Sequence, residues 1–408
     1  MHPDDRPNTQ RELSIDIIRG FALVCMVLIH FMVYFGNAEA VNTWLYFSLN
    51  HILGDWGAGG FLMIMGISQV LSGRKRTDLS NRLLFKRALI RGVFIFAVGL
   101  IMLALAWGPY KIWQWDILTL MGFATVVLFL CRYLPSWSIL LIAAVIALMT
   151  PFLRGQLAIA PIWNNNFMQV SMISSYFPGI LFDPAGALPT GWSVKDIVQG
   201  FLFTGEFPVF PWILFPLTGF VLGRRMIANQ IQKDLPFLLL LGVVLVVCGL
   251  GLGYAGSLRS GVSIISGYIV PLSFYPDSFP MIFAQSGISI IVIFILYYLY
   301  DIRGKNSRKL GRPAGLFTYV SRNALTFYFL HYLLIGWPLA IIYVFTGKYY
   351  IYNLMGSLPA FVCGIAAVGF LVLGLKIWEK HGSKYKLEWF LGVLTQRLAS
   401  GEQERNNR

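Results

Sequence analysis

Long apolar segments alternate with short polar loops along almost the whole chain. An α-helix of about 20 apolar residues crosses a hydrocarbon core about 30 Å thick. Ten such segments can be delimited: residues 14–36, 52–73, 88–107, 115–131, 136–153, 207–224, 236–255, 279–300, 318–345 and 353–376. The pattern predicts an all-α integral membrane protein whose ten or so transmembrane helices form one bundle.

Composition strengthens the membrane prediction. Of the 408 residues, 57% are hydrophobic and 12% are charged, whereas soluble proteins carry about 25% charged residues. So little charge cannot cover the surface of a soluble globule of this size, which excludes a cytosolic enzyme. The net charge of +14 lies mainly on lysines and arginines in the loops, so we expect lipid as the surrounding partner and no nucleic acid.

The basic residues also predict the orientation in the membrane. If the loops are assigned alternately to the two sides, one side holds sixteen lysines and arginines and the other holds five. Loops rich in lysine and arginine stay in the cytoplasm. Both termini are therefore predicted to be cytoplasmic, with residues 1–13 before one membrane domain at 14–378 and a basic tail at 379–408.

Two further features concern the loops and the cysteines. The longest outer connection, from about Arg154 to Glu206, is rich in aromatic residues, so we expect an ordered cover. Within it, Val194–Phe203 has the composition of a short interfacial helix. The four cysteines lie in apolar segments without metal-ligand spacing, so neither a disulfide nor a metal site is expected.

Polar side chains follow one face of the first apolar segment. Arg19 and His30 are eleven residues apart, which places them on nearly the same side of an α-helix, and Asp16 and Tyr34 lie close to that stripe. Charged groups at membrane depth cost roughly 2.5–3.5 kcal/mol each, so they usually have a function. The stripe predicts a functional path; the structural alternative is an Asp16–Arg19 helix cap beside a packed histidine.

Two more histidines occur near or within the apolar segments. His51 and Asp55 are four residues apart, so the carboxylate can fix the tautomer of the imidazole. A helix cap above a run of packing glycines explains them equally well. His331 lies in the middle of a span, where it must bond a neighbouring helix or line a cavity.

Each side of the membrane also offers a candidate binding surface. On the outer side, aromatic residues accompany Asp116 and Glu206. Together with Trp115, these acids would suit binding of a sugar-like polyol. The alternative is an ordinary belt of aromatic residues at the membrane surface, which has the same composition. On the inner side, Lys86, Arg87 and Arg91 recur at helical spacing. They predict a phosphate-binding surface, and topology alone is the alternative.

Several motifs resemble transmembrane acyltransferases. The first apolar segment resembles the acyltransferase-3 group, because it contains Asp16-Ile-Ile-Arg19-Gly20-Phe-Ala. Ten residues separate Arg19 from His30, as in that group. Asp55–Gly66 and Asn323–His331 resemble the catalytic domain of heparan-alpha-glucosaminide N-acetyltransferase. Phe207–Trp212 and Tyr275–Pro280 are similar to segments of its bacterial relatives, so we expect a bacterial inner-membrane location.

The chain departs from the second family in one respect. The lysosomal enzyme has an asparagine at the position of His30, and its catalytic histidine lies in the following outer loop, where this chain has only His51. The acyltransferase-3 pattern instead implies that His30 is catalytic. We favour His30, and the choice between the two histidines stays open at this point.

The resemblance implies an acyltransferase that uses cytoplasmic acyl-CoA, with acetyl-CoA as the expected donor, and no metal. It implies phosphate contacts from Lys86, Arg87, Arg91 and Arg19, and an extracytoplasmic glycan or glycolipid acceptor. The candidate acceptor-binding residues are Tyr34, Trp115, Asp116 and Glu206. The candidate catalytic residues are His30 as general base, assisted by His51 with Asp55 or by His331.

Two other functions remain open, and an oligomer is compatible with either. A proton-coupled secondary transporter would use the same histidines and acids as a relay, although no internal repeat of the transporter type is evident. A non-catalytic membrane scaffold would need them only for packing.

Overall fold

The computed structural model describes residues 12–74, 79–156, 194–258, 267–275, 277–303, 312–348 and 350–406. The long helices are α1 (Leu13–Phe35), α4 (Asp55–Gly73), α5 (Asn81–Trp107), α6 (Ile117–Cys131), α7 (Ser136–Gln156), α11 (Leu214–Ile227), α12 (Ile231–Ser257), α13 (Phe279–Tyr297), α14 (Arg312–Arg322), α15 (Ala324–Thr346), α16 (Ser357–Lys380) and α17 (Leu387–Asn406). Short helices are α2 (Ala38–Val41), α3 (Trp44–Phe47), η1 (Ser48–Gly54), η2 (Pro109–Gln114), α9 (Val194–Gln199), η3 (Gly200–Thr204), α10 (Val209–Trp212) and η5 (Tyr298–Ile302). Within these ranges the only β structure is a single bridge between Gly36 and Met355.

The predicted all-helical membrane fold is confirmed. Eight helical stretches among the described residues are long and apolar enough to cross a membrane. They are α1, α5, α7, α12, α13, α15, α16 and the stretch Ile197–Ile227 that ends with α11. The other two predicted spans are the helices α4, with 19 residues, and α6, with 15 residues, both packed into the bundle.

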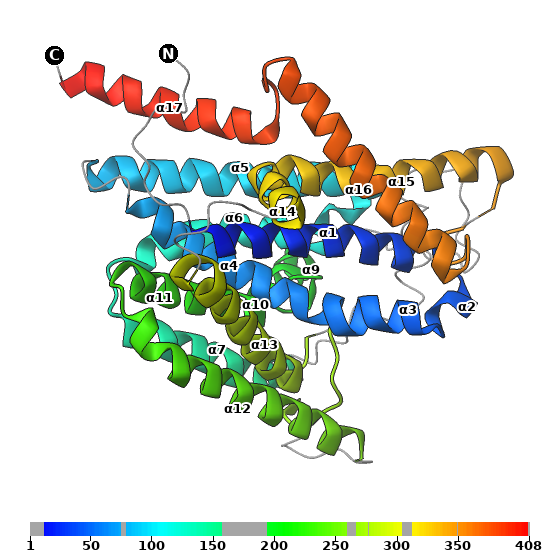
Figure 1. Cartoon of the computed structure of the whole chain (residues 1–408), viewed down its shortest axis with the longest axis horizontal. Helices are drawn as coiled ribbons and strands as arrows, with labels where there is room; N and C mark the ends of the chain where they lie inside the picture. The colour runs from blue at the N-terminus through cyan, green and yellow to red at the C-terminus, as the bar shows by residue number, and fades with distance from the viewer. Residues whose placement is uncertain are drawn as a thin grey trace.

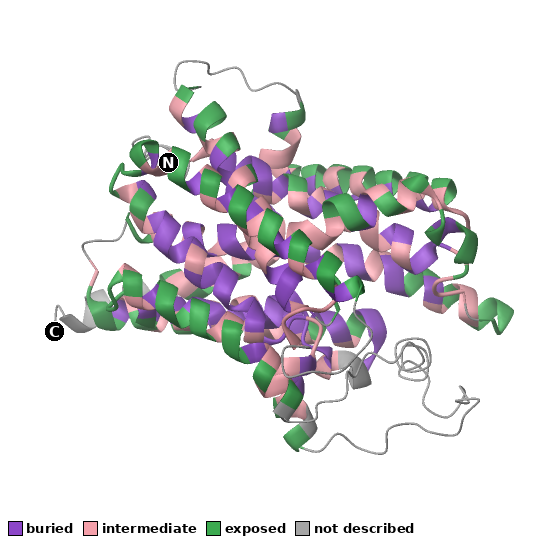
Figure 2. Cartoon of the chain, turned by 90° about the horizontal axis from the view of Figure 1, so that it is seen from below, coloured by how far each residue is buried: buried purple, intermediate pink, exposed green. Residues whose placement is uncertain are grey.

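Helix α1 occupies the middle of the bundle, where it contacts α4, α13, α14, α15 and α16 (Figure 1). Half of its most apolar window is buried, compared with 17% for α12 at the periphery. Figure 2 shows the same gradient, with buried residues at the centre and exposed ones on the outermost helices. Exposed leucines and valines suit contact with lipid, whereas the helices around α1 shield its polar stripe from lipid.

Close helix contacts explain one residue of the first-span motif. A Cβ atom on Gly20 would collide with the backbone carbonyl of Phe317 in α14. Glycine therefore allows α14 to cross α1 directly over the segment that carries Asp16 and Arg19. The inner end of the bundle is the end where α1 begins at Leu13, and the outer end is the end where α1 finishes at Phe35. The predicted orientation places the inner end in the cytoplasm.

The prediction that residues 318–345 form one continuous helix is wrong. Helix α14 ends at Arg322, and α15 begins at Ala324. Asn323 between them has φ −110° and donates its side-chain amide to the carbonyl of Tyr319. The chain changes direction here because the first amides of α15 bond to a side chain from α17 instead of continuing the α14 ladder.

The two predicted surface segments differ in outcome. Most of the expected outer cover, residues 157–193, lies outside the described residues. At its end the expected helix is confirmed, since α9 is followed directly by the π-helix η3. In the predicted C-terminal tail, residues 387–406 form the helix α17, which packs against α5 and α15.

Candidate active site

Two histidines that are 301 residues apart in the sequence meet inside the bundle. Nδ1 of His30 in α1 lies 3.0 Å from Nε2 of His331 in α15. The rings are nearly parallel, with centroids 5.2 Å apart. His331 is completely buried, whereas His30 is partly exposed. The sequence placed both residues in spans, and the resemblance implied that His331 could assist His30, but helix periodicity gave no reason to place the two rings side by side.

The backbone assigns the protons of this pair. Nδ1 of His331 faces the carbonyl oxygen of Tyr328, which can only accept a hydrogen bond. With both rings neutral, His331 therefore donates from Nδ1 and accepts at Nε2. His30 must then donate from Nδ1, which leaves the lone pair of its Nε2 available as a base.

A buried carboxylate supports the other side of His331. Asp116 is fully buried and accepts hydrogen bonds from the hydroxyl of Tyr328 (2.8 Å) and from the backbone amide of Leu118 (2.9 Å). The ring of Tyr328 packs edge-on against His331. Asp116 thus caps α6 and holds the turn of α15 that orients His331. Its contacts are with the protein interior, whereas the sequence suggested acceptor binding.

Aromatic rings enclose the outer side of His30. Tyr34, one turn along α1, meets it edge-on at 5.8 Å between centroids, and Tyr332 lies at 5.2 Å. Trp107 packs against both tyrosines. Tyr34 therefore lies beside His30, as the stripe on α1 predicts.

Four carboxylates gather around Tyr275 at the outer end. They are close enough to act electrostatically on its hydroxyl, and they are Asp55, Asp116, Glu206 and Asp277. Glu206 also acts on Tyr34, Tyr328 and Tyr332, which border the histidine pair. The predicted acids thus converge on one region although they come from separate loops.

Backbone contacts hold the loops that carry these acids. The amide of Glu206 donates to the carbonyl of Gln114 (2.7 Å), which joins the Glu206 loop to the segment before α6. The guanidinium of Arg154 donates to the carbonyls of Phe203 (3.0 Å) and Asp277 (2.9 Å). Arg154 therefore ties the Glu206 loop to the Asp277 loop.

The His51–Asp55 pair, which was predicted from its i,i+4 spacing, is present at the outer surface. Nδ1 of His51 lies 2.8 Å from Oδ2 of Asp55, and the imidazole is 54% exposed. The carbonyl of Asp55 accepts from the side chain of Gln285 (2.7 Å). Asp55 and Glu206 both act electrostatically on Tyr275, so the His51–Asp55 pair belongs to the same acidic outer region.

A cavity of about 350 Å³ opens on the other side of the histidine pair. Ligand sites usually measure about 300–1,000 Å³. Arg19, Arg91 and Arg322 line it towards the inner end, together with Ser68 and Ser321. Tyr328, whose ring touches His331, is part of its wall. The cavity therefore leads from three arginines to the neighbourhood of the histidine pair.

The predicted basic cluster is thus only partly assembled. Arg91 and Arg19 line the cavity, whereas Lys86 and Arg87, both in the described part of α5, are not among its lining residues. Arg322 joins the cavity because α14 packs against α1. Only its position one residue before the Asn323 motif could have indicated Arg322 from the sequence.

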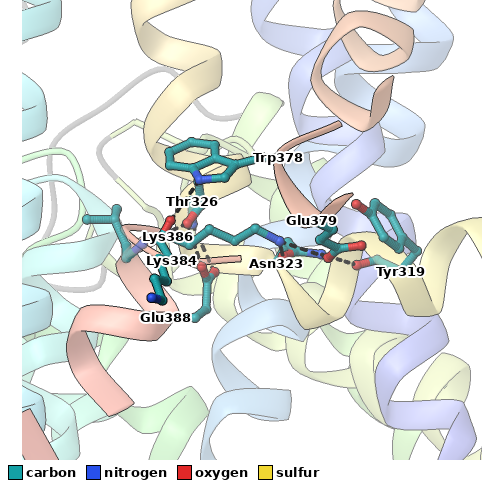
Figure 3. A network of polar contacts seen from close by, with 9 residues as sticks. Tyr319, Asn323, Thr326, Trp378, Glu379, Lys384, Lys386 and Glu388 are labelled. Atoms are coloured by element: carbon teal, nitrogen blue, oxygen red, sulfur yellow. Dashed lines mark hydrogen bonds and ion pairs between the residues drawn. The ribbon is translucent and has the colours of Figure 1, made fainter. Parts of the chain in front are cut away.

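Two side chains, Glu388 in α17 and Lys386 just before it, attach the C-terminal segment beside this cavity (Figure 3). The carboxylate of Glu388, a cavity-lining residue, accepts from the amides of Leu325 (2.8 Å) and Thr326 (2.9 Å) at the start of α15. The buried ammonium of Lys386 donates to Asn323 (3.0 Å) and to Glu379 (2.8 Å). Asn323 therefore anchors the C-terminal segment.

Trp115 is the predicted site residue whose surroundings differ most from a binding role. Its side chain is buried, and the ring packs against Phe201 and Phe96. Its carbonyl accepts from the amide of Phe207 (3.0 Å). It therefore supports the Glu206 loop from within.

Comparison with known proteins adds one match. The family described as heparan-alpha-glucosaminide N-acetyltransferase, catalytic, matches residues 11–249, which is more than half of the chain. The matched region contains His30, the His51–Asp55 pair, Asp116 and Glu206, and it ends before His331. No curated protein matches the sequence.

Proposed function

The chain belongs to the heparan-alpha-glucosaminide N-acetyltransferase catalytic family, and from this premise we propose that it transfers an acetyl group from cytoplasmic acetyl-CoA to a hydroxyl or amine of an extracytoplasmic glycan or glycolipid. The observation that carries the proposal is the position of the His30–His331 pair between the arginine-lined cavity and the acidic outer region. One side suits a phosphorylated donor, and the other suits a polar acceptor.

The inner cavity suits the donor by its charge. Arginine forms paired hydrogen bonds with phosphate oxygens, so Arg91 and Arg322 would hold the phosphates of the donor. Arg19 is already bonded to Asp16 (3.3 Å) and Ser321 (3.2 Å), which fixes its guanidinium at the cavity wall. The acyl end of the donor would lie towards Tyr328.

His30 is the residue suited to act on the acceptor. Its Nε2 lone pair would take the proton from the acceptor hydroxyl or amine as that atom attacks the thioester carbonyl. The carbon–sulfur bond then breaks, and the proton held by His30 is available to the departing CoA thiolate. The hydrogen bond to His331 keeps Nδ1 protonated throughout, the role that a carboxylate has in a serine protease.

The acceptor would enter from the outer end. Tyr34 meets His30 edge-on and is within electrostatic range of Glu206, and a carboxylate beside aromatic rings suits a hydroxyl-rich or amino-bearing sugar. His51 is on the surface side of this region and would receive or release protons without touching the thioester.

The test measures CoA release by the purified protein in lipid nanodiscs, with acetyl-CoA and a panel of sugar acceptors that includes glucosamine. His30→Ala should lower kcat about 10²- to 10⁴-fold. Arg91→Met should raise the KM for acetyl-CoA roughly tenfold, because a charge-assisted hydrogen bond contributes about 1.5–3 kcal/mol. Arg82→Met is the matched control, since Arg82 is exposed on the same helix and is not among the residues lining the described cavity.

The results separate the competing functions. Loss of activity only in His51→Ala would move the base to His51. If no folded variant or wild type releases CoA or binds it, the proposal is wrong, and substrate-driven proton flux into vesicles would then favour a transporter that uses the same histidines.

A further inference from the structure

Tyr352 has an unusual backbone conformation at the outer end of the bundle. Its φ is +60°, in the left-handed region. A residue with a Cβ atom is disfavoured there, whereas glycine and asparagine adopt it readily. Such conformations persist where the surrounding structure enforces them, often at functional sites.

The contacts that enforce it come from the end of α1. The amide of Tyr352 donates to the carbonyl of Tyr34 (2.8 Å), and the amides of Leu354 (3.2 Å) and Met355 (2.9 Å) donate to the carbonyl of Phe35. These bonds satisfy carbonyls that the last turn of a helix leaves open. They involve only the backbone, so a glycine or asparagine at position 352 would make them with less strain. The tyrosine side chain therefore needs a separate explanation.

The ring supplies that explanation. It stacks on the ring of Tyr34, with centroids 5.7 Å apart and an interplanar angle of 27°. Tyr34 in turn meets His30 edge-on and is almost completely buried, whereas Tyr352 is partly exposed. Glu206 acts electrostatically on both tyrosines. A continuous aromatic contact thus runs from the outer surface through Tyr34 to the His30 ring.

We propose that Tyr352 is a positioning residue for the transfer reaction: its ring, held over Tyr34 by a strained backbone, fixes Tyr34 against His30 and covers the outer approach to the base. The inference rests on the proposed function, because His30 is taken as the base. Tyr352 acts through Tyr34 and touches neither reacting atom.

The test replaces the ring while keeping or relaxing the backbone. Tyr352→Gly and Tyr352→Asn remove the ring and suit the left-handed conformation. Tyr352→Phe keeps the ring. Tyr385→Gly is the matched control, because Tyr385 is also a tyrosine in the left-handed region (φ +69°) but lies between α16 and α17, at the inner end.

In the nanodisc assay, Tyr352→Gly and Tyr352→Asn should lower kcat at least about tenfold, the effect of about 1.4 kcal/mol on a barrier. The KM for acetyl-CoA and the melting temperature should stay the same, or the melting temperature should rise as strain is removed. Tyr352→Phe and Tyr385→Gly should keep wild-type kcat. Normal kcat in Tyr352→Gly would overturn the proposal, and so would a loss of kcat that merely follows a loss of stability.

A second measurement does not depend on any substrate. Diethyl pyrocarbonate acylates unprotonated imidazole nitrogens, and mass spectrometry compares its rate at His30 with that at the exposed His381. Removing the ring should raise the His30 rate at least threefold in Tyr352→Gly but not in Tyr352→Phe. An unchanged ratio would overturn the positioning role. If the wild type releases no CoA yet the ratio rises, the aromatic cover is supported and the acetyltransferase proposal fails.

Discussion

Replacing His331 by leucine removes the acceptor of the hydrogen bond from His30 while keeping an apolar side chain in the core of α15. In the wild type, the carbonyl of Tyr328 fixes the proton of His331 on Nδ1, so Nε2 accepts from Nδ1 of His30 at 3.0 Å. His331→Leu leaves the His30 tautomer undetermined. It also removes a hydrogen-bond partner from the Nδ1–H of His30 and from the carbonyl of Tyr328. His331→Gln is the informative companion, because a glutamine oxygen can still accept from His30.

The magnitude follows from the single hydrogen bond that is lost. A neutral hydrogen bond in a folded protein contributes about 0.5–1.5 kcal/mol, and 1.36 kcal/mol corresponds to a tenfold change in rate. We therefore expect His331→Leu to lower kcat about tenfold, which is less than the roughly 10²- to 10⁴-fold loss for a missing general base in His30→Ala. Because the Nδ1–H of His30 loses its acceptor inside the bundle, the free energy of unfolding should fall by about 1–3 kcal/mol.

The assay compares wild type, His331→Leu, His331→Gln and His30→Ala in the same nanodiscs. CoA release gives kcat, acetyl-CoA titration gives donor binding, and thermal unfolding gives stability. Donor binding should be unchanged in all four proteins, since neither histidine is among the residues that line the described cavity. His331→Gln should recover most of the activity that His331→Leu loses.

Two outcomes would refute the reasoning. Wild-type kcat in a folded His331→Leu protein would show that the tautomer of His30 does not limit the reaction. A larger loss in His331→Leu than in His30→Ala would exchange the two roles and make His331 the base.

Two further predictions concern stability. Glu388→Gln weakens the carboxylate contacts to Leu325 and Thr326, so calorimetry should show that the free energy of unfolding falls by about 1–3 kcal/mol. CoA should bind more tightly to this variant, because a negative charge leaves the cavity wall. Unchanged stability together with unchanged CoA affinity would contradict the prediction. Burial raises the pKa of Asp277 well above its usual value, so its ionisation costs stability as the pH rises above the unfolded pKa. Asp277→Asn should melt higher than wild type at pH 8, with the difference disappearing towards about pH 4; an equal difference at both pH values would exclude the titration as its cause.

Parts of the site follow directly from the sequence because helix geometry is regular. The stripe of Asp16, Arg19, His30 and Tyr34 was predicted on one face of α1, and each of these residues faces another helix or the cavity. The His51–Asp55 contact was likewise predicted from i,i+4 spacing. Local spacing is sufficient here, since both partners belong to adjoining turns of one helical segment.

Other parts could not be predicted, because they depend on which helices pack together. The resemblance covers the whole Asn323–His331 segment, but it did not indicate that Asn323 bonds Lys386 while His331 bonds His30. The break between α14 and α15 was missed because Glu388, more than 60 residues later, supplies the acceptor for the first amides of α15. No local periodicity carries that information.

The membrane-spanning helices, the alternation of basic and neutral loops, and the polar face of α1 could all be predicted from the amino-acid sequence. These features follow from hydrophobic length and from a helical repeat of about 3.6 residues, both of which are local properties. Other contacts became known only from the packing of the helices: His30 meets His331, Arg322 and Glu388 line the cavity with Arg19 and Arg91, and Tyr352 stacks on Tyr34. Those contacts join segments far apart in the chain, and shape and close packing between whole helices select them.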